Sequence, residues 1–180
     1  MMRPISFLAA AIAGIGLTAG APDRFSQVVA AVAAGTRAER AGAGADLQRA
    51  ARTLAATGAK PIAGDEDLVE RWAAGGGTSP PAAPYRNRAL GPAYRKFVLA
   101  QGDTARFEQI FLAGQGARVA VVAAKGTAFQ LSVSDDDGHA VCDAARTSGR
   151  CDWVPLFTMR FKFALYNPGP AAAPYYIVMQ

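Results

Sequence analysis

The chain has 180 residues, of which 51% are hydrophobic and 18% are charged, with a formal net charge of +5. Alanine supplies 41 residues, nearly half of the hydrophobic total, and its methyl group buries too little surface to drive collapse as Leu or Phe does. This composition excludes a disordered tail, a disulfide-rich scaffold and a collagen-like chain. The length fits one domain of ordinary size with a small appendage.

Residues 1–21 have the pattern of a secretory signal peptide. Arg3 makes the first residues positive, Ile5–Leu17 is an uncharged run of 13 residues, and small residues follow it. The run is shorter than a bilayer-spanning helix, although a membrane anchor or a buried helix is the alternative. We predict cleavage after Gly20 or Ala21, a periplasmic or secreted location, and no transmembrane segment in the mature chain.

Residues 22–74 follow a helical pattern of apolar residues. The predicted helices run from a cap at Asp23 to a stop at Gly35, from about Asp46 to Gly58, and from Asp65 to Ala74. This segment has too few large side chains to fold alone. The helices therefore either dock on the second half or stay loosely ordered until a partner binds. We favour docking, because exposed apolar stripes promote aggregation.

Residues 75–89 are rich in Gly and Pro and predict a linker. From residue 90 to residue 180, apolar and polar residues alternate, which indicates strands with one buried face and one solvent-exposed face. The predicted strands are Tyr94–Leu99, Arg106–Leu112, Arg118–Ala123, Phe129–Ser134, Ala140–Asp143, Asp152–Leu156, Met159–Tyr166 and Tyr175–Met179. We therefore predict an α+β protein, in which a short α-helical N-terminal segment precedes an antiparallel β-sandwich or jelly roll of about eight strands.

The order of motifs in residues 90–180 adds a resemblance. A strand is followed by Leu112-Ala113-Gly114-Gln115, and later by Phe129-x-Leu131-x-Val133-x-Asp135-x-x-Gly138, an aromatic alternating strand and a Tyr-rich final strand. This order resembles the bacterial pre-peptidase C-terminal domain. The resemblance implies a jelly-roll-like sandwich of a secreted protein, often without catalysis of its own. We expect two departures from this family: predicted helices, and not a protease, stand before the domain in this sequence, and Cys142 stands near where relatives tend to have acidic residues.

The two cysteines are expected to form a disulfide. Cys142 and Cys151 flank a turn-like stretch in a chain predicted to reach an oxidising compartment. Such a bridge contributes about 2–3 kcal/mol by loop-closure entropy. The alternative is a reactive Cys142 thiol activated by His139.

The acidic turn at residues 135–138 is a candidate calcium site. An EF-hand fails, because its first and twelfth ligand positions fall on Val133 and Ala144. A looser site formed by Asp135, Asp137 and Asp143 stays open beside the alternative of a simple Asp-Gly hairpin turn.

Signatures of catalysis are missing from the sequence. One histidine, His139, excludes His-rich zinc sites, and no serine lies in a Gly-x-Ser-x-Gly motif. We predict a protein that is not an enzyme and needs no cofactor. An unrecognised enzyme centred on His139 and its neighbouring aspartates is a less favoured hypothesis.

The excess positive charge lies on the β-half, with eleven basic and seven acidic residues in residues 85–180. A candidate binding patch for an anionic lipid, a glycan or an acidic protein is formed by Tyr85, Arg86, Arg88, Tyr94, Arg95 and Lys96. The alternative is a solvated linker and first strand, and the dispersed pattern excludes nucleic acid.

The leading hypothesis is a non-catalytic exported protein whose β-sandwich binds an envelope or extracellular partner. The alternative is an accessory module that assists the secretion or stability of a partner enzyme.

Overall fold

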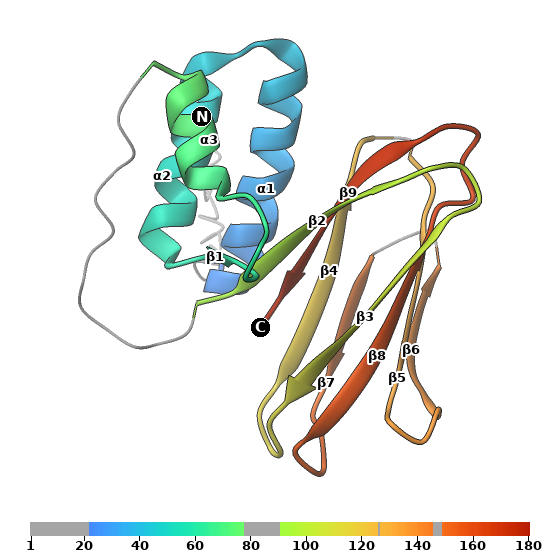
Figure 1. The fold of residues 1–180 in the computed structure, drawn as a ribbon. Coiled ribbons are helices and arrows are strands. Elements are labelled where there is room, and N and C mark those ends of the chain that lie inside the picture. Colours follow the sequence, from blue (N-terminus) through green and yellow to red (C-terminus); the bar gives the residue numbers. More distant parts are fainter. Residues whose placement is uncertain (1–21, 78–90, 126, 146–148) are drawn as a thin grey trace, which may run out of the picture.

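A computed structural model describes residues 22–77, 91–125, 127–145 and 149–180, with the backbone alone for residues 143–145 (Figure 1). The predicted signal peptide and residues 78–89 of the predicted linker lie outside these ranges. The described residues form α1 (Arg24–Ala41), α2 (Gly44–Thr57), β1 (Lys60–Pro61), α3 (Leu68–Gly75), β2 (Ala93–Leu99), β3 (Thr104–Phe111), β4 (Ala117–Ala123), β5 (Gln130–Ser134), β6 (Ala140–Ala145), β7 (Arg150–Trp153), β8 (Met159–Tyr166) and β9 (Ala173–Met179).

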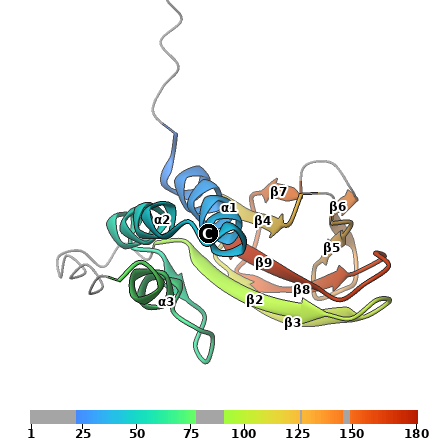
Figure 2. The same cartoon turned by 90° about the horizontal axis from the view of Figure 1, so that it is seen from above.

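These elements form three layers, with the helices on the outside of a two-sheet sandwich (Figure 2). The five-stranded sheet has the order β1-β2-β9-β4-β7, and the four-stranded sheet has the order β3-β8-β5-β6. All neighbours pair antiparallel except β1 and β2, which pair in parallel. The predicted α+β class and antiparallel sandwich are confirmed.

The last strand, β9, is buried on both faces, which explains its unbroken apolar sequence. Tyr175, Ile177 and Met179 pack into the core between the two sheets. Tyr176 and Val178, the alternate residues, pack against the helices. The helices therefore dock on the five-stranded sheet, in the arrangement favoured from the sequence.

Gly35 does not end the first helix, and this part of the prediction is wrong. Helix α1 continues to Ala41 and ends at Gly42, which takes the left-handed conformation with φ 64°. The ring of Trp72 occupies the space beside Gly35, and a Cβ atom there would come within 2.3 Å of it. Gly35 therefore serves the close approach of α1 and α3.

The other two helices follow the prediction more closely. Helix α2 ends at the predicted Gly58, with φ 70°. Helix α3 begins later than expected, at Leu68, because Asp67 and not Asp65 accepts the capping hydrogen bond, from Val69 N at 2.8 Å. In the described part of the chain, no helix is long and apolar enough to cross a bilayer.

One end of the sandwich is closed by a buried asparagine. This closed end contains the turn between β2 and β3 and the connection from β8 to β9. The side-chain amide of Asn167, fully buried, donates to the carbonyl oxygens of Leu99, Ala100 and Ala171 at 2.9–3.1 Å. Its oxygen accepts from Gly169 N at 2.9 Å. One side chain thus satisfies the backbone of both connections.

The predicted disulfide is confirmed. Cys142 lies on β6 in the four-stranded sheet, Cys151 lies on β7 in the five-stranded sheet, and the two are bonded. The bond therefore links the two sheets along one side of the sandwich. A reactive Cys142 thiol is ruled out in this structure.

Candidate binding surface at the open end of the sandwich

At the end opposite the closed end, two loops lie side by side, and the β5–β6 acidic turn lies at the same end of the sandwich. We call this end the open end. The β3–β4 loop covers residues 112–116 and the β7–β8 loop covers residues 154–158. Gly114 N donates to the carbonyl oxygen of Pro155 at 2.9 Å, and Ala113 N donates to Thr158 Oγ1 at 3.0 Å. These bonds join one loop to the other, and Figure 1 shows the two loops side by side at the lower end of the sandwich.

Large apolar side chains project from both loops into solvent. Leu156 and Phe157 are 84% and 72% exposed, and Leu112 and Val154 are also more than half exposed. We call these four residues the apolar tip. Single exposed apolar residues are ordinary, but a group of four on two joined loops is typical of an interaction site.

The apolar tip stands on a rigid aromatic base. Phe111 and Trp153, the last residues of β3 and β7, make an edge-to-face contact with ring centroids 5.1 Å apart. Phe161 on β8 packs on both rings, at 5.8 Å from Phe111 and 5.3 Å from Trp153. Each loop therefore leaves the sandwich from a packed position, so the ends of its backbone are anchored before any partner binds.

A groove of about 500 Å³ opens beside the apolar tip. Its lining includes Ile110 and Leu112 on one side, and Gly91, Ala93 and Met179 on the other. Strands β2 and β3 belong to different sheets and diverge from their shared turn, which separates the two sides of the groove (Figure 1). Side chains alternate along a strand, so Gln109 lies on the same inner face of β3 as Phe107 and Phe111, which pack in the core. Gln109 is nevertheless exposed, which shows that the two sheets are apart at this position.

The two joined loops of the open end are uncharged, and charged residues surround them, including the aspartates of the β5–β6 turn. Residues 109–117 and 153–159 contain no charged side chain. Beside them, Glu108 pairs with Arg160 at 3.0 Å, and Arg118 lies 3.1 Å from Asp23 and 3.4 Å from Asp152. An apolar centre inside a polar rim is the usual anatomy of a protein interface.

The sequence prediction missed this surface. It extended a strand from Asp152 through Leu156, whereas β7 ends at Trp153. Pro155 has no N–H for a ladder, and the adjacent pair Leu156-Phe157 breaks the alternation of a half-buried strand. These two features are the signal from which the apolar tip could have been found.

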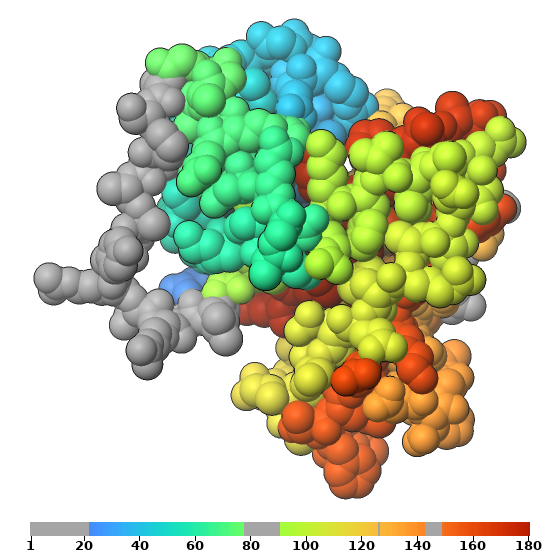
Figure 3. All heavy atoms as spheres, viewed as in Figure 1, coloured from blue at the N-terminus to red at the C-terminus, as the bar shows by residue number. Residues whose placement is uncertain are grey.

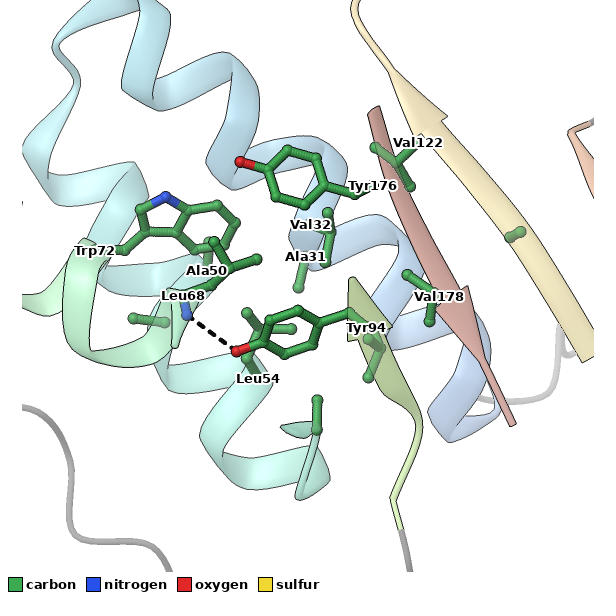
Figure 4. Close-up of a cluster of buried hydrophobic side chains, with 14 of the residues drawn as sticks. Ala31, Val32, Ala50, Leu54, Leu68, Trp72, Tyr94, Val122, Tyr176 and Val178 are labelled. Atoms are coloured by element: carbon green, nitrogen blue, oxygen red, sulfur yellow. Dashed lines mark hydrogen bonds between the residues drawn. The ribbon is translucent and has the colours of Figure 1, made fainter. Parts of the chain in front are cut away.

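The described members of the predicted cationic patch bind groups within the chain. Tyr94 is buried under the helices, where its hydroxyl accepts from Leu68 N at 2.9 Å and donates to Asp67 at 3.2 Å (Figure 4). Burial raises the pKa of Tyr94 above its usual range. Arg95 pairs with Asp65 at 2.8 Å, and Lys96 lies 3.9 Å from Glu66.

Tyr85, Arg86 and Arg88 lie outside the described residues, so anion binding by the whole patch stays a prediction. In the structure, Tyr94, Arg95 and Lys96 join the segment before α3 to β2.

The acidic turn brings three of the predicted residues together. Ligand atoms of Asp135, Asp137 and His139 all lie within 4.8 Å of one another. Asp135 accepts from His139 N at 2.8 Å, and Gly138 has φ 89°, as the predicted hairpin turn requires. Burial alone would raise the pKa of Asp135, but the hydrogen bonds from His139 hold it below its usual range. Only the backbone is described for Asp143, so calcium binding by Asp135, Asp137 and Asp143 stays a prediction.

Comparisons with known proteins concern the fold alone. No family model matches the chain, and no curated protein matches its sequence significantly. Among solved structures, the chain is similar to a periplasmic inhibitor of g-type lysozyme, PliG, from Aeromonas hydrophila, at 13% identity over 49% of this chain and 84% of that one (TM-score 0.41). The PliG of Salmonella Typhimurium is similar at 13% identity over 53% and 91% (TM-score 0.39).

A third similar structure is the pre-peptidase C-terminal domain of a collagenase from Bacillus anthracis. It shares 11% identity over 48% of this chain and 87% of that domain, with a TM-score of 0.41. The resemblance predicted from the motifs is thus found again in three dimensions, over about half of the chain.

Proposed function

We propose that this protein is a non-catalytic exported binding protein, which holds an envelope or extracellular protein partner at the open end of its β-sandwich. The observation that carries the proposal is the apolar tip, with four exposed side chains on two loops that are joined to each other and anchored on packed aromatic rings. Interfaces are commonly dominated by a few such side chains, with aromatic residues prominent among them.

Two further features support export. The first 21 residues have the pattern of a secretory signal peptide. A disulfide that links the two sheets fits an oxidising compartment.

The uncharged loops of the open end favour a protein partner over an anionic glycan or lipid. Ligands of the latter kind are recognised by unpaired cations, whereas Arg118 and Arg160 beside the apolar tip both have carboxylate partners. The complementary partner surface is apolar and concave at its middle, because Leu156 and Phe157 protrude.

The test compares three purified forms as bait in a periplasmic extract of the native cell. The double variant Leu156→Ser/Phe157→Ser removes the apolar tip, and Val98→Ser is the matched control, because Val98 is 67% exposed on β2 near the closed end. We expect the wild type and the control to recover the same partner, and the double variant to recover at least about tenfold less.

All three forms should melt alike, because exposed side chains contribute within about 0.5 kcal/mol to stability. Equal recovery of the partner by the double variant would contradict the proposed function.

A further inference from the structure

We propose that two copies of this chain associate by antiparallel pairing of their β3 strands, centred on Phe107. The pairing would join the two four-stranded sheets into one continuous sheet. This inference goes beyond the proposed function, since it uses the backbone edge of β3 and not the exposed side chains of the β7–β8 loop.

The first observation is that β3 has a free edge. It is the end strand of its sheet, and β8 is its ladder neighbour among the described residues. At the start of this ladder, Asn167 N donates to the carbonyl oxygen of Asp103 at 3.0 Å. Hydrogen bonding alternates along an antiparallel ladder, so the backbone groups of the even-numbered residues 104–110 point away from β8.

One of these outward-pointing backbone groups, the carbonyl of Ile110, accepts a hydrogen bond from a side chain in place of a neighbouring strand. The side-chain amide of Gln109 donates to the carbonyl oxygen of Ile110 over a long 3.3 Å, at an exposed position. A neighbouring strand would offer this carbonyl a backbone N–H instead. On the face viewed in Figure 3, the yellow-green surface of β2 and β3 lies uncovered by the helices. An uncovered edge of this kind is a template for a further strand.

The charged side chains of β3 favour a second β3 strand as the partner and favour one register of pairing. Arg106 and Glu108 are exposed on the outer face of β3, and among the described residues no carboxylate lies within ion-pair distance of Arg106. When two β3 strands pair with Phe107 opposite Phe107, Arg106 of each copy lies directly opposite Glu108 of the other. The pairing thus gives two cross-strand pairs of opposite charge, related by the twofold axis.

Neighbouring registers are poorer. A shift of one residue centres the pairing on Arg106 or on Glu108, and it then places two like charges opposite each other, which is destabilising. In the favoured register, the half-exposed Ile110 of each copy lies over Thr104 of the other. The sequence of β3 is therefore complementary to itself in one register.

The test uses charge reversal and restoration. The mass of the purified protein is measured by light scattering and sedimentation at concentrations up to about 1 mM, where even weak association is visible. We expect the wild type to form a dimer. Arg106→Glu should raise its dissociation constant at least about tenfold, because two attractive pairs become repulsive.

The double variant Arg106→Glu/Glu108→Arg should bring the dissociation constant back to within about threefold of the wild type, since its pairs are again opposite in charge. Glu108→Arg also removes the ion pair between Glu108 and Arg160 within each copy. Because this loss does not favour dimerisation, a restored dimer would be explained by the new pairs between the two copies. Lys125→Glu, in an exposed turn outside β3, is the control for net charge and should leave the dimer unchanged.

Three outcomes would overturn the inference. The wild type is a monomer at every concentration, the double variant stays as weak as Arg106→Glu, or the dimer is lost with Leu156→Ser/Phe157→Ser and not with Arg106→Glu. The last outcome would place the contact at the apolar tip. None of these measurements involves a heterologous partner, so failure here is separate from failure of the proposed function.

Discussion

The two ends of the sandwich differ in which side chains they bury. The closed end buries a polar side chain, whereas the open end exposes apolar ones. At the closed end, one buried side chain, Asn167, satisfies the backbone of two connections. At the open end, the loops bond to each other and leave Leu156 and Phe157 in solvent. The buried amide of the closed end therefore stabilises the fold, whereas the exposed side chains of the apolar tip contribute little to stability and are available for binding.

The largest effect is expected from removing the closed-end side chain. Asn167→Ala leaves several buried carbonyl groups without donors, and we expect it to lower the free energy of unfolding by about 3 kcal/mol. Gln101→Ala, which also removes an amide but at an exposed position of the same end, should change it by no more than about 0.5 kcal/mol. Denaturant unfolding of both variants measures this difference, and equal values would show that the closed end does not depend on Asn167.

A smaller, pH-dependent effect is expected where the helices pack on the five-stranded sheet, at the buried tyrosines Tyr94 and Tyr176. Burial raises the pKa of Tyr94 and of Tyr176, although the Arg71 cation opposes the shift at Tyr176. A tyrosine that stays protonated in the folded state contributes its full stability below the unfolded pKa of about 10, and loses it as the pH rises further. Between pH 10 and 11, each such residue should cost at most about 1.4 kcal/mol.

Denaturant unfolding across pH 8–11 tests this expectation. Tyr176→Phe should reduce the alkaline loss, because the variant has one ionisable buried ring fewer. The apolar tip should not change the profile, so Leu156→Ser/Phe157→Ser is the control. A profile as steep in Tyr176→Phe as in the wild type would show that folding does not raise the pKa of Tyr176.

The sequence predicted the parts of this molecule that local patterns control. Alternation located β8 at its observed bounds, Met159–Tyr166, and composition with spacing predicted the disulfide. Gly35 was misjudged, because its reason is a ring 37 positions further along the chain. Likewise, pairing of Arg95 with Asp65 depends on how a loop folds back on β2, which no local pattern reveals.

The binding surface escaped prediction for the same physical reason. Leu112 and Phe157 are far apart in sequence, and they share one surface only because two loops meet at one end of a sandwich. A run of apolar residues in a β-rich chain is more often core, and exposure is decided by where the neighbouring strand ends.

The most direct test of the account is photo-crosslinking in the native cell, with a photoreactive phenylalanine at position 157 or at position 98. The two positions are similarly exposed, at 72% and 67%, but they lie at opposite ends of the sandwich. We predict a discrete crosslinked protein from position 157 and none from position 98. Crosslinking from position 98 alone, or equal crosslinking from both positions, would contradict the claim that the open end is the binding surface.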